Sequence, residues 1–186
     1  NRDATNDQVT INAANEIKKV GVGIKCATIT PDDKRVEEFS LKKKYPSPNG
    51  TIRNILKGTI FREPLICKNI PKIVPHWNKP VIIARHAFGD IYKAKDLKVK
   101  KGSTVNIELI DNDKNIVKKE VHQFGSDGVT LGMLNEDESI RNFAKSCMLY
   151  ASEKGINLFL STKNTILQNY DERFKEIFEE EFDKNF

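Results

Sequence analysis

The chain has 186 residues, enough for one globular domain or for parts of two, and 38% of them are hydrophobic while 31% are charged. No apolar run approaches the roughly 20 residues of a membrane-spanning helix, which argues against insertion into a bilayer. The net charge of +5 raises nucleic acid as a partner, but the lysines are scattered without interleaved aromatic residues, so we interpret them as solvated surface charge.

The chain begins at Asn1 rather than at methionine, and a helical pattern follows at once. We therefore expect a fragment or a processed product of a longer protein. The three cysteines, Cys26, Cys67 and Cys147, are widely spaced among apolar neighbours. They indicate neither a disulfide framework nor a Cys-x-x-Cys metal site, and a reducing compartment fits them best.

A helix, a strand and a second helix are predicted over the first 40 residues. Residues 5–20 have an amphipathic pattern that opens on a capping box and is followed by Gly21 as a stop. Residues 23–28 alternate like a short strand. The run Thr30-Pro31-Asp32-Asp33 then supplies an N-cap, a proline at the first helical position and two acidic residues for the next helix.

The middle of the chain predicts a short helix and two strands. A loop from Ser47 leads into a helix that Gly58 ends. Residues 59–65 and 80–84 are predicted strands, and the second is a continuous apolar run, typical of a strand buried on both faces of a sheet. Arg85-His86 follows at its carboxyl end, where open α/β sheets keep their ligands.

From residue 90 to residue 134 the sequence changes to short β-like segments. They cover residues 97–99, 104–110, 116–124 and 129–134. Polar turn residues at 111–115 and 125–128 separate them, and we interpret both turns as hairpin loops. A β insertion of this length predicts an arm or an interface.

Two further helices are predicted after the β-rich region. Asn135 and Glu138 predict a capped helix that stops at Gly155. A strand at residues 158–161 would deliver Lys163 to its carboxyl end. The last helix has an apolar face made of Tyr170, Phe174, Ile177, Phe178 and Phe182. We expect a further segment or a partner to cover this aromatic face.

The segment from Ser47 to Arg53 has the features of an anion site. A helix N-terminus presents unpaired backbone N–H groups, and Gly50 lets an anion approach the backbone closely. Ser47 and Asn49 add side chains that form hydrogen bonds. An ordinary capped helix with a surface arginine would have the same pattern, so both interpretations stay open at this point.

Arg53, Arg62 and Arg85 fall within one stretch of a chain in which lysine is otherwise the commoner cation. A buried guanidinium must be paired, because it does not lose its proton. Either each arginine pairs with an internal acid, or the three converge on a ligand with several carboxylate or phosphate groups. Such a ligand would remove their mutual repulsion.

Tyr92 and Lys163 are the candidates for proton transfer. Alone, a tyrosine in such a position is more often packed, and a loop lysine is more often solvated, than catalytic. Near several arginines, however, like charge and ligand binding ease the release of a proton, which general acid–base catalysis requires.

Five motifs resemble those of the eukaryotic-type NADP-dependent isocitrate dehydrogenases. They are Ser47-Pro48-Asn49-Gly50-Thr51-Ile52-Arg53-Asn54, Arg62-Glu63, Ile66-Cys67-Lys68-Asn69-Ile70-Pro71, Arg85-His86-Ala87-Phe88-Gly89-Asp90 and Leu160-Ser161-Thr162-Lys163-Asn164-Thr165-Ile166-Leu167. The motifs occur in the family's order and at its separations, and the similarity covers residues 1–186. Phe88 replaces the family's commoner tyrosine.

The resemblance implies oxidative decarboxylation of isocitrate to 2-oxoglutarate with reduction of NADP, as in the tricarboxylic acid cycle or the glyoxylate bypass. The residues implied to hold isocitrate are Thr30, Ser47, Asn49, Gly50, Thr51, Arg53, Arg62 and Arg85. The residues implied to contact NADP are Lys25, Thr28, Thr30, Arg35 and Asn49. Tyr92 and Lys163 match the proton-transfer pair, and Lys163 would act in the site of the other subunit.

The implied fold is the α/β three-layer fold of the isocitrate and isopropylmalate dehydrogenases, incomplete in this chain. Residues 1–57 would be part of a large domain and residues 58–89 the first part of a small domain. Residues 90–136 would form a β-rich clasp that joins a homodimer, and residues 137–186 would continue the small domain.

The family's ligands for Mg²⁺ or Mn²⁺ lie outside this chain, so we expect no metal ligand among these residues and no activity from them alone. Two further hypotheses are an assembly module that dimerises without chemistry and a nucleic-acid-binding protein. The resemblance implies the cytoplasm or the mitochondrial matrix as location, with no membrane partner.

Overall fold

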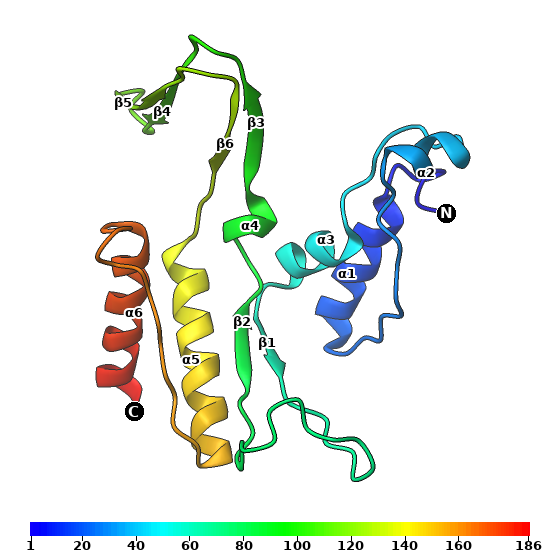
Figure 1. The fold of residues 1–186 in the computed structure, drawn as a ribbon, viewed down its shortest axis with the longest axis vertical. Helices are drawn as coiled ribbons and strands as arrows, with labels where there is room; N and C mark the ends of the chain where they lie inside the picture. The colour runs from blue at the N-terminus through cyan, green and yellow to red at the C-terminus, as the bar shows by residue number, and fades with distance from the viewer. The chain divides into compact units, whose positions relative to one another are not determined.

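A computed structural model describes residues 1–186, which form two compact units (Figure 1). One unit contains Asn1–Tyr92 and Asn135–Phe186, and the other contains Lys93–Leu134. The helices are α1 (Gln8–Val20), α2 (Asp33–Glu38), α3 (Pro48–Leu56), α4 (Asp90–Lys93), α5 (Asp137–Lys154) and α6 (Tyr170–Asn185). The strands are β1 (Thr59–Arg62), β2 (Ile83–His86), β3 (Lys95–Val99), β4 (Thr104–Ile110), β5 (Ile116–Gln123) and β6 (Gly128–Gly132).

The first helix forms as predicted but starts three residues later. α1 begins at Gln8 because Asp7, with a φ of 70°, has left-handed rather than helical backbone. The helix packs against α3, and its buried residues are Thr10 and Ala14, while Val20 at its end is 66% exposed. Gly21 ends the helix at a φ of 85°, as predicted.

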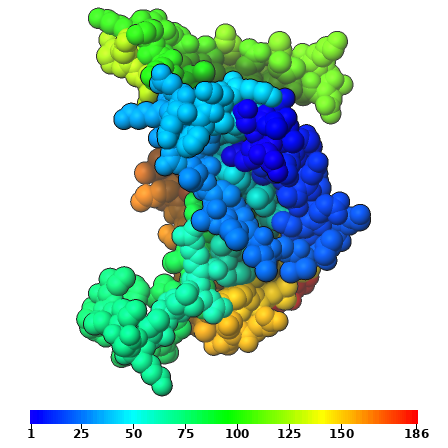
Figure 2. All heavy atoms as spheres, turned by 90° about the vertical axis from the view of Figure 1, so that its right-hand side faces the viewer, coloured from blue at the N-terminus to red at the C-terminus, as the bar shows by residue number.

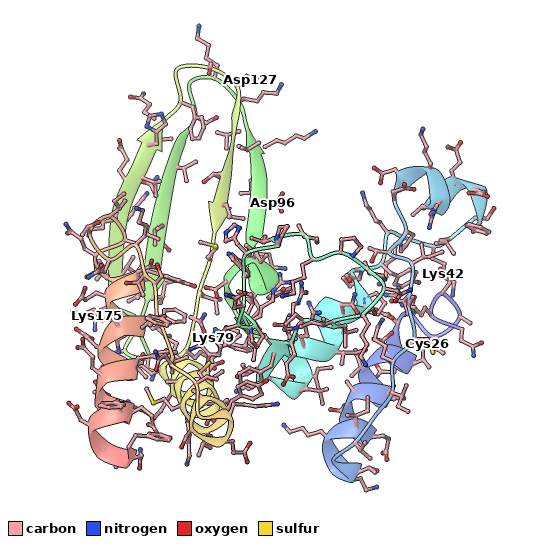
Figure 3. All side chains as sticks on the ribbon, turned by 60° about the horizontal axis from the view of Figure 1, so that its bottom comes forward. Cys26, Lys42, Lys79, Asp96, Asp127 and Lys175 are labelled. Atoms are coloured by element: carbon pink, nitrogen blue, oxygen red, sulfur yellow. The ribbon has the colours of Figure 1, made fainter.

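The segment after α1 is extended but unpaired. The predicted strand at residues 23–28 is absent, because no other strand lies beside it. Cys26 lies on this segment and is exposed (Figure 3). The next helix, α2, starts later than predicted because Asp32, and not Thr30, caps it: the Asp32 carboxylate accepts a hydrogen bond from the backbone N–H of Arg35 at 2.9 Å.

Asp7 anchors the turn that precedes α1. Its carboxylate accepts hydrogen bonds from Arg2 Nε at 2.6 Å, from Arg2 Nη2 at 2.8 Å and from the Thr10 hydroxyl at 2.5 Å. The bonds from the Arg2 guanidinium are the largest cause that holds the pKa of Asp7 below its ordinary value of 3.8. The charged form of Asp7 therefore stabilises the folded chain.

We expect the Asp7→Asn variant to lose about 1 to 3 kcal/mol of unfolding free energy at neutral pH, since Arg2 loses a charged partner. The folded-state pKa of Asp7 is lowered, so the wild-type advantage is complete above the unfolded pKa and is lost as the pH falls through the folded pKa. Urea unfolding of both proteins at neutral pH and at about pH 3 measures this. A difference that stayed constant between the two pH values would contradict it.

β1 and β2 form an antiparallel pair whose two faces differ in character. Phe61 lies opposite Ala84, and both pack against the core that α5 provides. Because side chains alternate along a strand, Arg62 and Arg85 lie on the face away from that core. The two arginines are thus separated from the apolar interior.

β1 ends at Arg62, earlier than predicted, and β2 differs from its prediction in position and burial. β2 covers Ile83–His86, so Arg85 and His86 lie within the strand and not beyond its end. Its single neighbour is β1, and Ile83 is 57% exposed. The predicted burial on both faces is wrong because only one face is covered.

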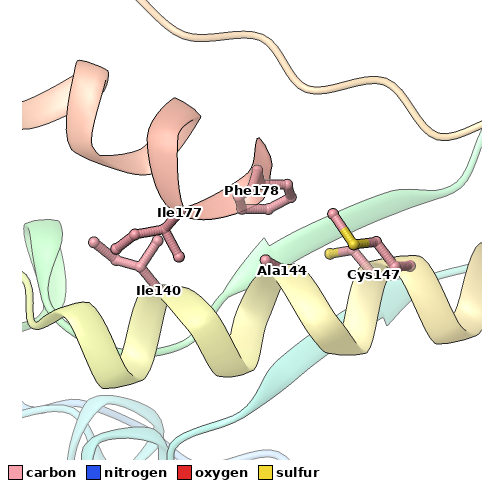
Figure 4. Packing of buried hydrophobic residues seen from close by; sticks show 6 residues of the cluster. Ile140, Ala144, Cys147, Ile177 and Phe178 are labelled. Atoms are coloured by element: carbon pink, nitrogen blue, oxygen red, sulfur yellow. The ribbon is translucent and has the colours of Figure 1, made fainter. Parts of the chain in front are cut away.

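The main core lies between α5 and α6 (Figure 4). Its buried residues are Ile140, Ala144, Cys147, Met148, Ile177 and Phe178. Burial raises the pKa of the Cys147 thiol to about 12, so this cysteine stays protonated and packs as a small apolar group. α5 covers most of the aromatic face that we expected to be uncovered, and Phe182 remains 57% exposed.

The start of α5 and the segment after it differ from prediction. Glu136, and not Asn135, is the N-cap, and Asn135 Nδ2 instead donates to the carbonyl of Phe88 at 3.5 Å. Gly155 ends α5 at a φ of 61°, as predicted. The predicted strand at residues 158–161 is extended but unpaired.

The second unit contains two antiparallel strand pairs. β4 and β5 form the predicted hairpin, and Asp111 closes its turn by accepting hydrogen bonds from the backbone N–H groups of Asp113 and Asn115 at 2.9 Å each. β3 pairs with β6, so residues 125–128 connect strands of different pairs and are not the predicted second hairpin loop. Apolar side chains on the hairpin are largely exposed: Ile107, Leu109, Ile110, Ile116, Val117 and Val121.

The segment between β1 and β2, residues 63–82, has no regular secondary structure. It projects as a separate lobe, turquoise in Figure 2, and Leu65 and Ile73 on it are 96% and 100% exposed. None of the helices is long and apolar enough to cross a membrane.

Candidate functional site

Arg53, Arg85 and Tyr92 lie together in the first unit. Arg53 Nη1 donates a hydrogen bond to the Tyr92 hydroxyl at 3.3 Å, and its guanidinium carbon lies 5.5 Å from the centre of the Tyr92 ring. The guanidinium carbon of Arg85 lies 5.0 Å from the same ring centre. All three side chains are half-buried. One tyrosine is therefore in contact with two cations.

Three elements bring these residues together. Arg53 lies on the last turns of α3, Arg85 lies on the face of β2 that points away from the core, and Tyr92 lies on the single turn of α4. Gly89, with a φ of 69°, allows α4 to start directly after β2. Asn54 Nδ2 donates to the Tyr92 carbonyl at 3.2 Å and ties α3 to α4.

The candidate arginines form no ion pair with a carboxylate of this chain. The arginines that do form such pairs are Arg2, Arg141 and Arg173. The interpretation in which Arg53, Arg62 and Arg85 each hold an internal acid is therefore excluded in this structure. Their charge is available for an anionic ligand.

Arg62 is not part of the cluster around Tyr92. It is exposed and lies two residues beyond the strand partner of Arg85, on the same face of the β1–β2 pair. The structure thus brings two of the three arginines into contact with one tyrosine and places the third farther along the same face.

The start of α3 offers free backbone donors. Ser47 is its N-cap, but the Ser47 hydroxyl makes no capping hydrogen bond, and the first helical bond runs from Thr51 N to the Ser47 carbonyl at 3.1 Å. The N–H groups of Asn49 and Gly50 therefore have no acceptor in the chain. Asn49 is exposed, and no atom lies within 4 Å of the place that a Gly50 side chain would take.

The loop before α3 is held in place by the N-terminal turn. Tyr45 is 2% exposed, and its hydroxyl donates to the Asp3 carboxylate at 3.0 Å. Arg2 Nη2 donates to the Pro46 carbonyl at 2.8 Å. These contacts fix the chain immediately before Ser47, so they set where α3 begins.

The predicted cofactor residues lie on or near the extended segment after α1. Lys25, Thr28 and Thr30 are exposed on that segment, and Arg35 is half-buried on α2. Lys25 Nζ donates to the Cys26 carbonyl at 2.8 Å, and Arg35 has no carboxylate partner. These residues supply two cations, from Lys25 and Arg35, and two hydroxyl groups, from Thr28 and Thr30, and such groups can bind phosphates. The structure shows no contact between these residues and Tyr92.

Lys163 is exposed on the turn before α6 and contacts neither Tyr92 nor the arginines. Its backbone N–H donates to the Asp171 carboxylate at 2.5 Å, and the next residue, Asn164, donates through Nδ2 to Glu172 at 2.6 Å. The first turn of α6 therefore holds the Lys163 loop.

A polar network beside the cluster was missed by the sequence analysis. His86 Nε2 lies 2.9 Å from the Ser139 hydroxyl, and the Tyr170 hydroxyl donates to Asp90 at 2.5 Å. His86 Nδ1 lies 3.8 Å from the same Asp90 carboxylate. A signal appears only when the strand is extended to His86, because alternation then places His86 on the core face with Ala84, where a polar side chain needs partners.

A cavity of about 1050 Å³ adjoins this network in the first unit. Its walls come from β2, from α5 and from the extended residues 155–162, and most of them are apolar. Arg85, Asp90, Tyr92 and Tyr170 contribute polar groups to its lining. The cluster thus borders a space that is large enough for a small ligand.

No group of three or more histidine, cysteine, aspartate or glutamate side chains could hold a metal ion in residues 1–186. The residues of this chain therefore do not by themselves fit a divalent metal.

The first unit therefore holds two arginines without a carboxylate partner against one tyrosine. The sequence model of the isocitrate/isopropylmalate dehydrogenase family matches residues 1–186, so the chain belongs to this family.

The relatives that the chain matches include NADP-dependent isocitrate dehydrogenases. The protein of that name from Sphingobium yanoikuyae is 56% identical over 185 residues. The mitochondrial proteins of that name from Sus scrofa and Homo sapiens are 58% and 57% identical over 187 residues. Each match covers 100% of this chain but only 46%, 44% and 41% of the relatives, so the chain spans less than half of their length.

Proposed function

We propose that the protein to which these residues belong oxidises and decarboxylates isocitrate to 2-oxoglutarate while it reduces NADP. The observation that carries this proposal is the pair of arginines, Arg53 and Arg85, that contact Tyr92 without an acid to neutralise them. The names of the relatives support the same reaction.

The substrate would bind through its carboxylates. Arg53 and Arg85 can each hold one carboxylate by two parallel hydrogen bonds, and Arg62 lies on the same strand face for a third. The free N–H groups at the start of α3 favour a negative charge beside Ser47 and Thr51. We assign the same role to the Asn49 amide, the Gly50 N–H group and the Thr30 hydroxyl.

The cofactor would lie along the exposed segment and the start of α3. We assign its contacts to Lys25, Thr28, Thr30, Arg35 and Asn49, because cations and hydroxyl groups recognise phosphates and ribose. NADP⁺ held by these residues would supply the hydride acceptor for the oxidation of isocitrate.

Tyr92 and Lys163 would move protons. The Tyr92 hydroxyl lies beside Arg53, so it can exchange a proton with a substrate held by the arginines. Lys163 is exposed and lies away from Tyr92 in this chain, which fits a role in the site of a second subunit. Both are therefore proposed as catalytic residues.

We further propose a homodimer of the family's three-layer fold. Residues 90–136 would be the clasp, and the exposed apolar side chains of the β4–β5 hairpin support an interface there. Residues 1–57 would belong to the large domain, and residues 58–89 and 137–186 to the small domain. Mg²⁺ or Mn²⁺ would take its ligands from outside this chain, and the location would be the cytoplasm or the mitochondrial matrix.

A spectrophotometric assay of the complete protein tests the function. We expect NADPH to form with isocitrate, NADP⁺ and Mn²⁺, and we expect none from residues 1–186 alone, because the metal that neutralises charge during decarboxylation has no ligands there. A complete protein that dimerises in sedimentation without turnover would overturn the proposal in favour of a non-catalytic assembly module.

A further inference from the structure

Asp90 starts α4 in an unusual backbone conformation. Its φ is 45°, in the left-handed region that residues other than glycine rarely adopt. Such a conformation persists only where the surroundings hold it. The position of Tyr92, two residues later on the same turn, depends on what holds Asp90.

Two side chains lie against the Asp90 carboxylate. The Tyr170 hydroxyl donates a hydrogen bond to it at 2.5 Å, and His86 Nδ1 lies 3.8 Å from it. Burial by itself would raise the pKa of Asp90, but the interactions with the neighbouring polar side chains, among them His86 and Tyr170, outweigh burial and lower the pKa. The carboxylate therefore stays ionised and keeps its acceptor role.

His86 is itself fixed in place. Besides its contact with the Ser139 hydroxyl at 2.9 Å, its ring stacks on Phe143 at 4.9 Å between centres and meets Phe174 at 5.8 Å. His86 follows Arg85 in β2, so the network holds the chain on both sides of the tight turn at residues 87–89. One side carries Arg85 and the other carries Tyr92.

Tyr170 belongs to the turn of α6 that also holds the Lys163 loop. The next two residues, Asp171 and Glu172, accept the hydrogen bonds from the Lys163 backbone and the Asn164 side chain. The first turn of α6 therefore makes two contacts. Tyr170 contacts the α4 turn, and Asp171 and Glu172 contact the Lys163 loop.

We propose that Tyr170 is a positioning residue for the reaction: its hydrogen bond to Asp90 fixes Tyr92 against Arg53 and Arg85 and ties the Lys163 loop to the same turn. The inference depends on the proposed function, because that function gives Tyr92 and Lys163 their roles. Tyr170 itself touches neither Arg53 nor Tyr92, so it acts through Asp90.

The test uses the complete protein and the Tyr170→Phe variant, which removes the hydroxyl and keeps the ring. We expect kcat to fall about 10- to 100-fold, because a small misplacement of a reacting group has effects of that size. The KM for NADP should stay within about twofold, since the cofactor residues lie elsewhere. A Tyr150→Phe variant is the matched control, because Tyr150 also donates to a carboxylate, that of Glu63. Its kcat should equal that of the wild type.

A double-mutant cycle with Asp90→Asn separates positioning from general stability. If the hydroxyl acts through Asp90, the double variant should have nearly the kcat of the slower single variant. If the two substitutions lowered kcat independently, the kcat of the double variant would fall by the product of the two single losses, and this result would overturn the inference. An unchanged kcat in Tyr170→Phe would also overturn it. If Asp90→Asn does not fold, the kcat of Tyr170→Phe against the Tyr150→Phe control decides alone. Absence of turnover in the wild type would instead refute the proposed function.

Discussion

Replacing Arg85 with glutamine in the complete protein is expected to raise the KM for isocitrate by about 10- to 100-fold. The loss of a charged, two-bond contact to a carboxylate costs about 1.5 to 3 kcal/mol, and each 1.4 kcal/mol corresponds to roughly a tenfold change in affinity. Arg85 has no carboxylate partner in the chain, so its substitution leaves no internal acid unpaired. Steady-state kinetics with isocitrate and NADP varied separately measure the effect.

Arg141→Gln is the matched control for Arg85→Gln. Arg141 is also half-buried, but its guanidinium binds Glu180 at 2.6 Å on α6, away from the cluster around Tyr92. We expect its KM for isocitrate to equal that of the wild type. Equal KM values in Arg85→Gln and in the wild type would show that Arg85 does not hold the substrate.

Truncating Ile177 to alanine is expected to destabilise the first unit by about 2 to 5 kcal/mol, the usual cost of a large cavity in a core. Ile177 is completely buried, within the cluster that α5 and α6 form (Figure 4). The variant buries less apolar surface on folding, and the atoms that line the new cavity lose their van der Waals partners. Urea unfolding followed by circular dichroism measures the change.

Phe182→Ala on the same helix is the control for Ile177→Ala. Phe182 is 57% exposed, so its truncation removes little buried surface and should cost well below half as much, about 1 kcal/mol or less. If both variants lost the same stability, burial in the core would not explain the loss in Ile177→Ala, because alanine favours the helix at both positions.

The β-rich region and the long helices could be predicted closely because their signals are local. Alternating apolar and polar residues between turn residues predict the strands of the β-rich region. The apolar residues from Ile140 to Ala151 recur with a period of 3.6 residues, which predicts α5. Gly21 and Gly155 end helices in the left-handed conformation that their missing side chains allow. These features need no knowledge of distant residues.

Strand pairing could not be predicted in the same way. Residues 23–28 and 158–161 have strand-like patterns but stay unpaired, while 125–128 joins strands of different pairs. A strand forms only when another strand supplies its hydrogen bonds, and that partner is a property of the fold.

The sequence by itself determined the family and all helical segments except α4, and it singled out the arginines that we propose to hold a tricarboxylate. Only the tertiary structure decided that Arg53 and Arg85 contact the same tyrosine, that Arg62 stands apart from them, and that Tyr170 reaches Asp90 across 80 residues. The physical reason is that side-chain periodicity encodes which face a residue occupies, whereas contacts between distant segments depend on how those faces pack together.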